Sequence, residues 1–102
     1  MKKRTFMHTA AALALASALP VAHAQSTPIK FQLDWRFEGP AALFLQPVAK
    51  GYFKAAGLDV TVDAGNGSGG AVQRVASGTY DMGFADLAAV MEFHANNPDA
   101  QN

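Results

Sequence analysis

The stretch LDVTVDAGNGSGGAVQRVASG, from Leu58 to Gly78, decides the fold. Its first five residues, LDVTV, predict a strand. The glycine-rich loop DAGNGSGG (residues 63–70) follows the strand. AVQRVASG (residues 71–78) then places apolar side chains at helical spacing, which predicts a short helix that Gly78 ends.

On the N-terminal side, residues 29–35 (IKFQLDW) alternate apolar and polar side chains, which predicts another strand. Pro40 suits the first turn of a helix, and residues 41–57 predict a helix that ends at Gly57. Pro47 lies inside this helix and should kink or split it into two short segments. The strand carries its apolar side chains on one side: Ile29, Phe31, Leu33 and Trp35.

On the C-terminal side, residues 81–85 (DMGFA) predict a short third strand, and residues 86–95 predict a third helix with Asp86 as its N-cap. The order is then β-α-β-α-β-α. Such an alternation predicts an α/β fold, in which helices pack on a parallel sheet through right-handed crossovers. In the third helix, Leu87, Val90, Met91 and His94 fall at i, i+3, i+4 and i+7, which predicts an apolar face, and we expect His94 to lie at the surface near the C-terminus of the helix.

In a parallel sheet, the C-terminal end of every strand lies on the same edge as the start of the next helix. Three loops should therefore converge there: residues 35–40, 63–70 and 85–86. Ligands of open α/β sheets bind at that edge. The sequence thus predicts where a site would lie before any side chain is considered.

The glycines at 65, 67 and 70 match the pattern G-x-G-x-x-G, and Asp86 follows after about twenty residues. A dinucleotide loop is disfavoured because this loop follows the second strand and precedes a very short helix. A Walker A loop is excluded because no Lys-Ser or Lys-Thr follows. Two interpretations stay open: the amides of Ser68, Gly69 and Gly70 bind a ligand at a helix N-terminus, or Ser68 merely caps the helix beside a mobile turn.

The first 24 residues have the three parts of a secretory signal peptide. Lys2, Lys3 and Arg4 form a basic head, residues 9–22 are apolar, and Ala-His-Ala at 22–24 predicts cleavage after Ala24. The apolar run is shorter than the ~20 residues of a membrane span. The chain has no cysteine, which excludes disulfides, cysteine zinc sites and a lipoprotein anchor. We therefore expect a free periplasmic protein.

Residues 25–102 carry five basic side chains and eight carboxylates, a net charge of −3. A mildly acidic chain without a basic patch argues against nucleic acid as a partner. No spacing of His94 or of the carboxylates suggests catalysis or metal binding, so we expect no catalytic residue, no metal and no cofactor. The length allows one domain at most.

Four stretches resemble the NMT1/THI5-like family in their order along the chain: LDW (33–35), KGYFKAAGLDV (50–60), GNGSGG (65–70) and VASGTYDMGFAD (75–86). This family comprises periplasmic substrate-binding proteins of ABC importers, related to binders of sulfonates, nitrate and pyrimidine precursors. The resemblance runs from about Ile29 to Pro98. It implies a two-lobed fold of the type II periplasmic-binding class, with residues 25–102 forming part of the first lobe. Members are about three times longer, so a fragment is expected.

The resemblance also implies a set of ligand-binding residues in the first lobe. The family places an aromatic residue at the cleft where this chain has Trp35, although an indole at a strand end also suits a core. The carboxylates of Glu38 and Asp86 would accept hydrogen bonds from an amino or amidine group, although Asp86 also suits a plain N-cap. The expected ligand-binding set is Trp35, Glu38, Gly39, Ser68, Gly69, Gly70 and Asp86.

The resemblance implies a monomeric solute-binding protein that delivers a small polar or aromatic metabolite to an ABC permease. Two alternatives stay open. One is a truncated remnant that binds nothing. The other is an enzyme of pyrimidine synthesis like the yeast members, which is disfavoured by the export signal and by the lack of cysteine.

Overall fold

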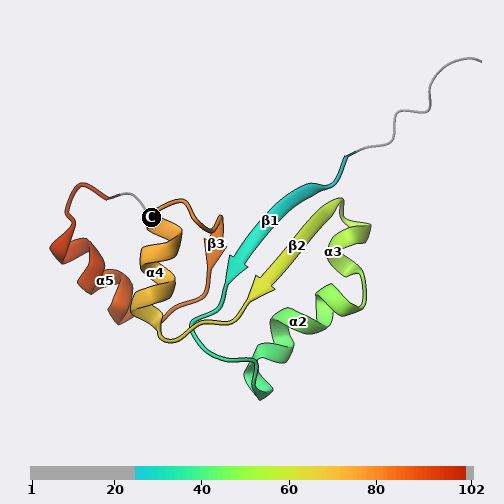
Figure 1. Cartoon of the computed structure of the whole chain (residues 1–102), viewed down its shortest axis with the longest axis horizontal. Helices are drawn as coiled ribbons and strands as arrows, with labels where there is room; N and C mark the ends of the chain where they lie inside the picture. The colour runs from blue at the N-terminus through green and yellow to red at the C-terminus, as the bar shows by residue number, and fades with distance from the viewer. Residues whose placement is uncertain (1–24, 101–102) are drawn as a thin grey trace, which may run out of the picture.

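The computed structural model describes residues 25–100, and the predicted signal peptide lies outside them. Three strands and their connecting helices follow the expected alternation, and the strands form one parallel sheet in the order β2-β1-β3 (Figure 1). The predicted α/β fold is therefore confirmed. The elements are β1 (Thr27–Gln32), η1 (Gly39–Ala41), α2 (Ala42–Ala49), α3 (Tyr52–Ala55), β2 (Leu58–Asp63), α4 (Ser68–Ala76), β3 (Met82–Gly83) and α5 (Leu87–Asn96).

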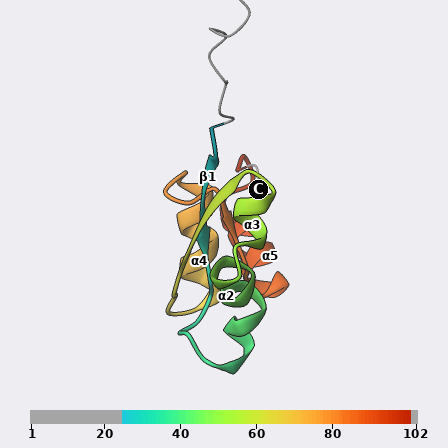
Figure 2. The same ribbon diagram turned by 90° about the vertical axis from the view of Figure 1, so that its right-hand side faces the viewer.

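The strand order reverses at β1, which lies between the other two strands. Gln32, the last residue of β1, is paired with Asp63 of β2 and with Gly83 of β3. Helices α2 and α3 lie on one side of β1 and α4 lies on the other (Figure 2). Helix α5 packs against α4. Within the described part of the chain, no helix has the length and apolar character needed to cross a membrane.

The first strand ends earlier than predicted, at Gln32 rather than Trp35. Leu33 still donates its amide to the carbonyl of Asp63 at 2.9 Å, but the carbonyl of Trp35 accepts from Gly65 in the loop after β2. The chain therefore leaves the sheet to meet that loop. Trp35 is 46 % exposed, so the alternative in which its indole lies in the core at the end of a strand is wrong.

The helix predicted between residues 41 and 57 is split as expected, but at Gly51 and not at Pro47. Pro47 is accommodated inside α2, where it removes only the hydrogen bond to the carbonyl of Leu43, a highly exposed residue. Gly51 has a φ of 72°, a left-handed conformation that ends α2 and turns the chain into α3. Gly57 follows α3 as predicted.

Helix α4 begins at Ser68, three residues earlier than predicted. Gly67 is the N-cap, and Gly69 and Gly70 form the first turn, where amides need no partner within the helix. The helix therefore includes Gly69 and Gly70, which the sequence analysis placed in the preceding loop. Of the predicted apolar face, Ala71 and Val72 are buried and Val75 is half-buried, whereas Ala76 is exposed.

The predicted apolar face of α5 is only partly correct. Asp86 is the N-cap as predicted, and its carboxylate accepts from the amide of Ala88 at 2.8 Å. Val90 is half-buried, but Leu87 and Met91 are 70 % and 66 % exposed. The helix packs on α4 alone, so only its Val90 side has a neighbour. His94, expected at the surface, is half-buried.

The apolar core occupies both sides of the sheet. On the side of α2, the ring of Phe44 lies 5.3 Å from that of Phe31 in β1 and 5.3 Å from that of Phe84 after β3. Aromatic pairs at this separation add about 0.5–1.5 kcal/mol to their burial. On the side of α4, Ala71 and Val72 pack toward the sheet. These contacts hold β3 to the rest of the sheet although the strand is only two residues long.

Gln32 is a buried polar residue that sequence analysis missed. It is fully buried, and its amide nitrogen donates to the carbonyls of Leu33 and Ala64, each at 2.8 Å. Its side-chain oxygen accepts from the guanidinium of Arg74 at 3.1 Å. The side chain therefore joins the end of β1 to the loop after β2 and to α4.

We expect Gln32→Met to lower the free energy of unfolding by about 1–3 kcal/mol, because it leaves two carbonyls without their donor. The matched control is Gln73→Met, since Gln73 is exposed on α4. That substitution should change stability by less than about 0.5 kcal/mol. Urea unfolding followed by far-UV circular dichroism measures both. Equal midpoints for the two variants would contradict the assigned role of Gln32.

Candidate functional site

Three loops meet at the C-terminal edge of the sheet, as the parallel topology predicts. The amide of Gly65 donates to the carbonyl of Trp35 at 3.0 Å, and the amide of Gly67 donates to the carbonyl of Asp34. The hydroxyl of Ser68 accepts from the amide of Asp86 at 2.8 Å. The loops after β1, β2 and β3 are thus joined by hydrogen bonds, and we call this edge, residues 33–40, 63–70 and 83–86, the rim.

Gly65 is buried where the loop after β2 crosses the end of β1. A Cβ at this position would lie 2.0 Å from the carbonyl oxygen of Leu33 and 2.9 Å from the carbonyl carbon of Asp34. No side chain fits against backbone at that distance. The loop can therefore lie against β1 only because residue 65 is glycine.

This contact gives the pattern G-x-G-x-x-G a structural explanation. Gly65 permits the close approach to β1, and Gly67 is the N-cap of α4. Gly70 lies in the first turn of α4, with open space around its Cα. The three glycines have separate local roles here, so their spacing alone does not indicate a dinucleotide.

Ser68 links the rim through its hydroxyl group. It donates to a carboxylate oxygen of Asp34 at 3.2 Å and accepts from the amide of Asp86. It does not cap α4, because Gly67 is the N-cap. The alternative in which Ser68 merely caps the helix is therefore wrong, and the hydrogen and one lone pair of its hydroxyl are used within the rim. Asp34 was missed because a single aspartate before a tryptophan carries no spacing signal.

The first-turn amides of α4 fit the expected ligand-binding role better than the hydroxyl does. Ser68, Gly69 and Gly70 occupy the first three positions of the helix, so their amides have no acceptor inside it. Among residues 25–100, no other acceptor takes these amides. Gly69 and Gly70 are exposed. The amides can therefore donate to a carbonyl or to another acceptor from solvent.

Trp35 borders a shallow hollow of about 90 Å³ at the rim. Phe44 and Phe84 line it with apolar rings, and Asp34 and Glu38 also line it. The guanidinium of Arg36 lies 5.0 Å from the centre of the Trp35 ring, within the range of a cation–π contact. The indole is thus partly exposed above an apolar hollow, which suits stacking on a flat ligand.

The remaining predicted residues lie at helix starts along the rim. Glu38 precedes η1 at its N-cap position without capping it, and Gly39 is the first residue of η1. Both are exposed. Asp86 caps α5, so its predicted role as an N-cap is confirmed. The structure therefore places the whole predicted set along one edge, but only Trp35 and Glu38 line the hollow.

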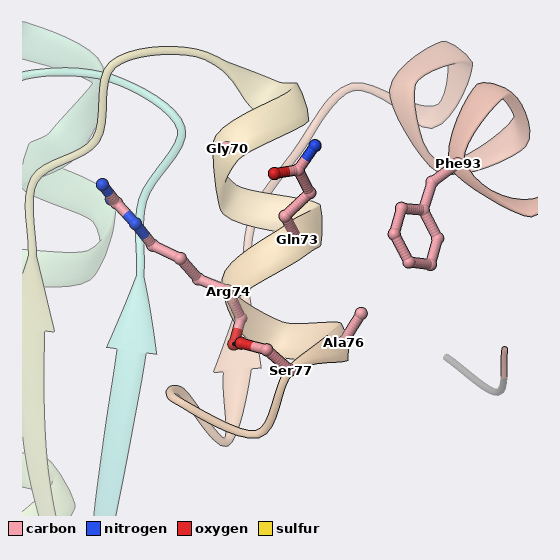
Figure 3. A pocket seen from close by; sticks show the side chains of 6 residues that line it. All are labelled: Gly70, Gln73, Arg74, Ala76, Ser77 and Phe93. Carbon is pink, nitrogen blue, oxygen red and sulfur yellow. Dashed lines mark hydrogen bonds between the residues drawn. The ribbon is translucent and has the colours of Figure 1, made fainter. Parts of the chain in front are cut away.

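A larger hollow of about 580 Å³ lies between α4 and α5 (Figure 3). Gln73 and Phe93 flank it, whereas Arg74 extends away from it toward β1 and β2. Gly70 also lines it, at the end nearer the rim. No residue of the other two loops reaches this hollow. It therefore lacks the convergence of loops that makes the rim a candidate site.

A polar cluster on the α4 side of the sheet supports β2. The hydroxyl of Tyr80 donates to the carboxylate of Asp63 at 2.8 Å. This hydrogen bond raises the pKa of Tyr80 above its ordinary value, and partial burial and the charge of Asp63 raise it further, whereas Arg74 opposes the shift. The ammonium of Lys30 lies 4.9 Å from the centre of the Tyr80 ring. The cluster thus holds the loop before β3 against the end of β2.

The rim has the chemistry of binding: free amides, carboxylates and a partly exposed indole. Between residues 25 and 100, no group of three or more histidine, aspartate or glutamate side chains is placed to hold a metal ion. A parallel α/β sheet that gathers such groups at the C-terminal ends of its strands has the form of a ligand-binding lobe.

The comparison with protein families agrees with this form. The family model described as NMT1/THI5 like matches residues 42–98, which is more than half of the chain. The chain belongs to the NMT1/THI5-like family, which has a type II periplasmic-binding-protein fold and consists mostly of substrate-binding proteins. No curated protein and no solved structure matches the chain.

The matched range covers only part of the predicted site. It includes Ser68, Gly69, Gly70 and Asp86, whereas Trp35 lies before it. Glu38 and Gly39 also lie before it. The family model therefore gives no support for the assignment of Trp35, Glu38 and Gly39. The assignment of all seven residues as ligand-binding stays a prediction.

We expect Gly65→Ala to lower the free energy of unfolding by about 1–3 kcal/mol or more, because the added Cβ must push the loop away from β1. Gly69→Ala is the control, since open space surrounds that position in the first turn of α4. It should leave stability unchanged or raise it by up to about 1 kcal/mol. Urea midpoints give both values, and a Gly65→Ala variant as stable as the parent would contradict the close approach.

We expect Tyr80 to ionise above the ordinary tyrosine value of about 10. Because its pKa is raised in the folded chain, the contribution of Tyr80 to stability is complete below pH ~10 and is lost as the pH rises through the higher folded value. Asp63→Asn should shift the ionisation to lower pH. Absorbance at 295 nm measures it, with Tyr80→Phe to identify the Tyr80 part of the curve. An unchanged curve in Asp63→Asn would remove Asp63 as the cause.

Proposed function

We propose that the chain is the solute-binding component of an ABC importer and captures a small polar or aromatic metabolite. The observation that carries this proposal is the joining of three loops at one edge of a parallel sheet, through Gly65, Ser68 and Asp86. Membership of the NMT1/THI5-like family supports it. The ligand classes that the family suggests are pyrimidine precursors, sulfonates, nitrate and related compounds.

The rim supplies three kinds of contact to such a ligand. Trp35 stacks on a flat group above the apolar hollow, the amides of Gly69 and Gly70 donate to an acceptor, and the carboxylate of Glu38 accepts from a donor. A ligand held between this rim and a second lobe would shift an open–closed equilibrium toward the closed state. Closure then presents the loaded protein to a permease.

The proposed location is the periplasm, after cleavage of the signal peptide at Ala24. Residues 2–24 support this with their basic head, apolar run and Ala-His-Ala end. The proposed partners are the small ligand and an ABC permease of the inner membrane, and the proposed state is a monomer.

Binding accounts for the rim better than catalysis does. The one hydroxyl at its centre, that of Ser68, donates to Asp34 and accepts from the amide of Asp86. A serine nucleophile needs an adjacent general base such as histidine. His94 lies in the last turn of α5, away from the rim, and the chain has no cysteine. The rim therefore holds a ligand without an evident means to react with it.

Titration with a ligand panel tests the proposed function. Trp35 is the only tryptophan, so its fluorescence reports the rim alone. We expect at least one compound among pyrimidines, sulfonates, nitrate and aromatic acids to change the emission at saturable concentrations. For that compound, Trp35→Leu should weaken binding by about 2- to 10-fold in calorimetry, because the stacking contribution of 0.5–1.5 kcal/mol is lost.

The matched control is Tyr52→Leu, which removes an exposed aromatic ring from α3, away from the rim. It should bind the compound as the parent does. Equal affinity of Trp35→Leu and the parent would remove the stacking role. A parent chain that binds nothing in the panel would contradict the proposed function and favour a remnant without ligand.

A further inference from the structure

Each of the three helices that start at the rim has a carboxylate of the chain at its N-terminus. Glu38 precedes η1, Asp86 caps α5, and Asp34 lies beside the first residue of α4. Arg36 is the only basic residue in the three loops of the rim, and its guanidinium lies over the Trp35 ring. The rim thus carries more negative than positive side chains, although helix N-termini attract anions.

The position of Asp34 is fixed by two hydrogen bonds to the start of α4. Its carboxylate accepts from the hydroxyl of Ser68 at 3.2 Å, and its carbonyl accepts from the amide of Gly67. Asp34 is half-buried, so it cannot turn freely into solvent. Asp86 is held in the same way, by the bond from Ala88 to its carboxylate and by its own amide, which donates to Ser68.

These carboxylates change which acceptors the free amides of α4 can donate to. A helix N-terminus carries the equivalent of about half a positive charge, and Asp34 already supplies a full negative charge beside it. An anionic group that approached Gly69 and Gly70 would meet the charge of half-buried Asp34 and that of exposed Asp86, and like charges placed side by side repel. A neutral carbonyl or a ring nitrogen would meet no such repulsion.

We propose that Asp34 and Asp86 are specificity-determining residues that exclude anionic ligands from the rim and select neutral or cationic ligands with N–H donors. The inference rests on the proposed function and narrows it: among the classes that the family suggests, it favours nitrogen-bearing compounds over sulfonates and nitrate. Asp34 has a further role as a brace of the loop, and the experiment separates selection from bracing.

The experiment measures anion binding at α4 with sodium sulfate and ethanesulfonate as probes. Backbone amide shifts of Gly69 and Gly70 in ¹H–¹⁵N spectra report the titration, at constant ionic strength, for the parent and for Asp34→Asn. The matched control is Asp59→Asn, which removes the same charge from an exposed position near the start of β2, away from the rim. Asparagine keeps an acceptor for Ser68, so the brace is retained.

We expect Asp34→Asn to bind sulfate about tenfold more tightly than the parent and Asp59→Asn do, which corresponds to removal of one like-charge contact. A parent that already binds sulfate at Gly69 and Gly70 as tightly as Asp34→Asn would overturn the proposal. So would an equal gain in Asp34→Asn and Asp59→Asn, because net charge alone would then explain it.

Asp86→Asn provides the second variant if Asp34→Asn does not fold. Asparagine is as good an N-cap as aspartate, so α5 is retained. Asp86→Asn should also bind sulfate about tenfold more tightly than Asp59→Asn does. Equal sulfate affinity of these two variants would overturn the proposal. The two failures can be told apart: a ligand panel without any binding contradicts the proposed function, whereas sulfate titrations of the variants decide the selection of charge independently of that panel.

Discussion

The position of the loop after β2 depends on the close approach of Gly65 to the end of β1. With no Cβ at residue 65, the loop lies against the carbonyl of Leu33 and donates an amide to the carbonyl of Trp35. The side-chain amide of Gln32 stabilises the same crossing, because it donates to the carbonyl of Ala64 in the loop. Because α4 starts four residues after Ala64, the crossing decides where its first turn lies, and hence that Ser68 meets Asp34.

The bonds that assemble the rim also limit what it can offer to a ligand. The hydroxyl of Ser68 is used to hold the loops together, so the free donors are the first-turn amides of α4. The acceptors that remain are carboxylates: Asp34 keeps lone pairs, and Glu38 is exposed beside the hollow. A rim of amides and carboxylates around an indole supports the proposal that the ligand is a flat molecule with donors and acceptors and not a compact anion.

Most of the architecture could be predicted from the sequence, because hydrophobic periodicity and glycine positions set the elements. The exceptions share a cause. Trp35 leaves the strand since its carbonyl is taken by Gly65, a residue thirty positions away, and local alternation carries no sign of such a bond. Leu87 and Met91 have the spacing of a buried face, but α5 has only α4 to pack against. Asp34 and Gln32 act through tertiary hydrogen bonds, which no motif records.

The family match covers two of the three loops of the rim, residues 63–70 and 83–86, and leaves the loop after β1 outside it. The matched range begins after Pro40 and contains Gly65, Gly67 and Ser68. Each of these residues bonds to, or lies against, the unmatched segment that carries Leu33, Asp34 and Trp35. The matched part therefore fixes the backbone of the unmatched part.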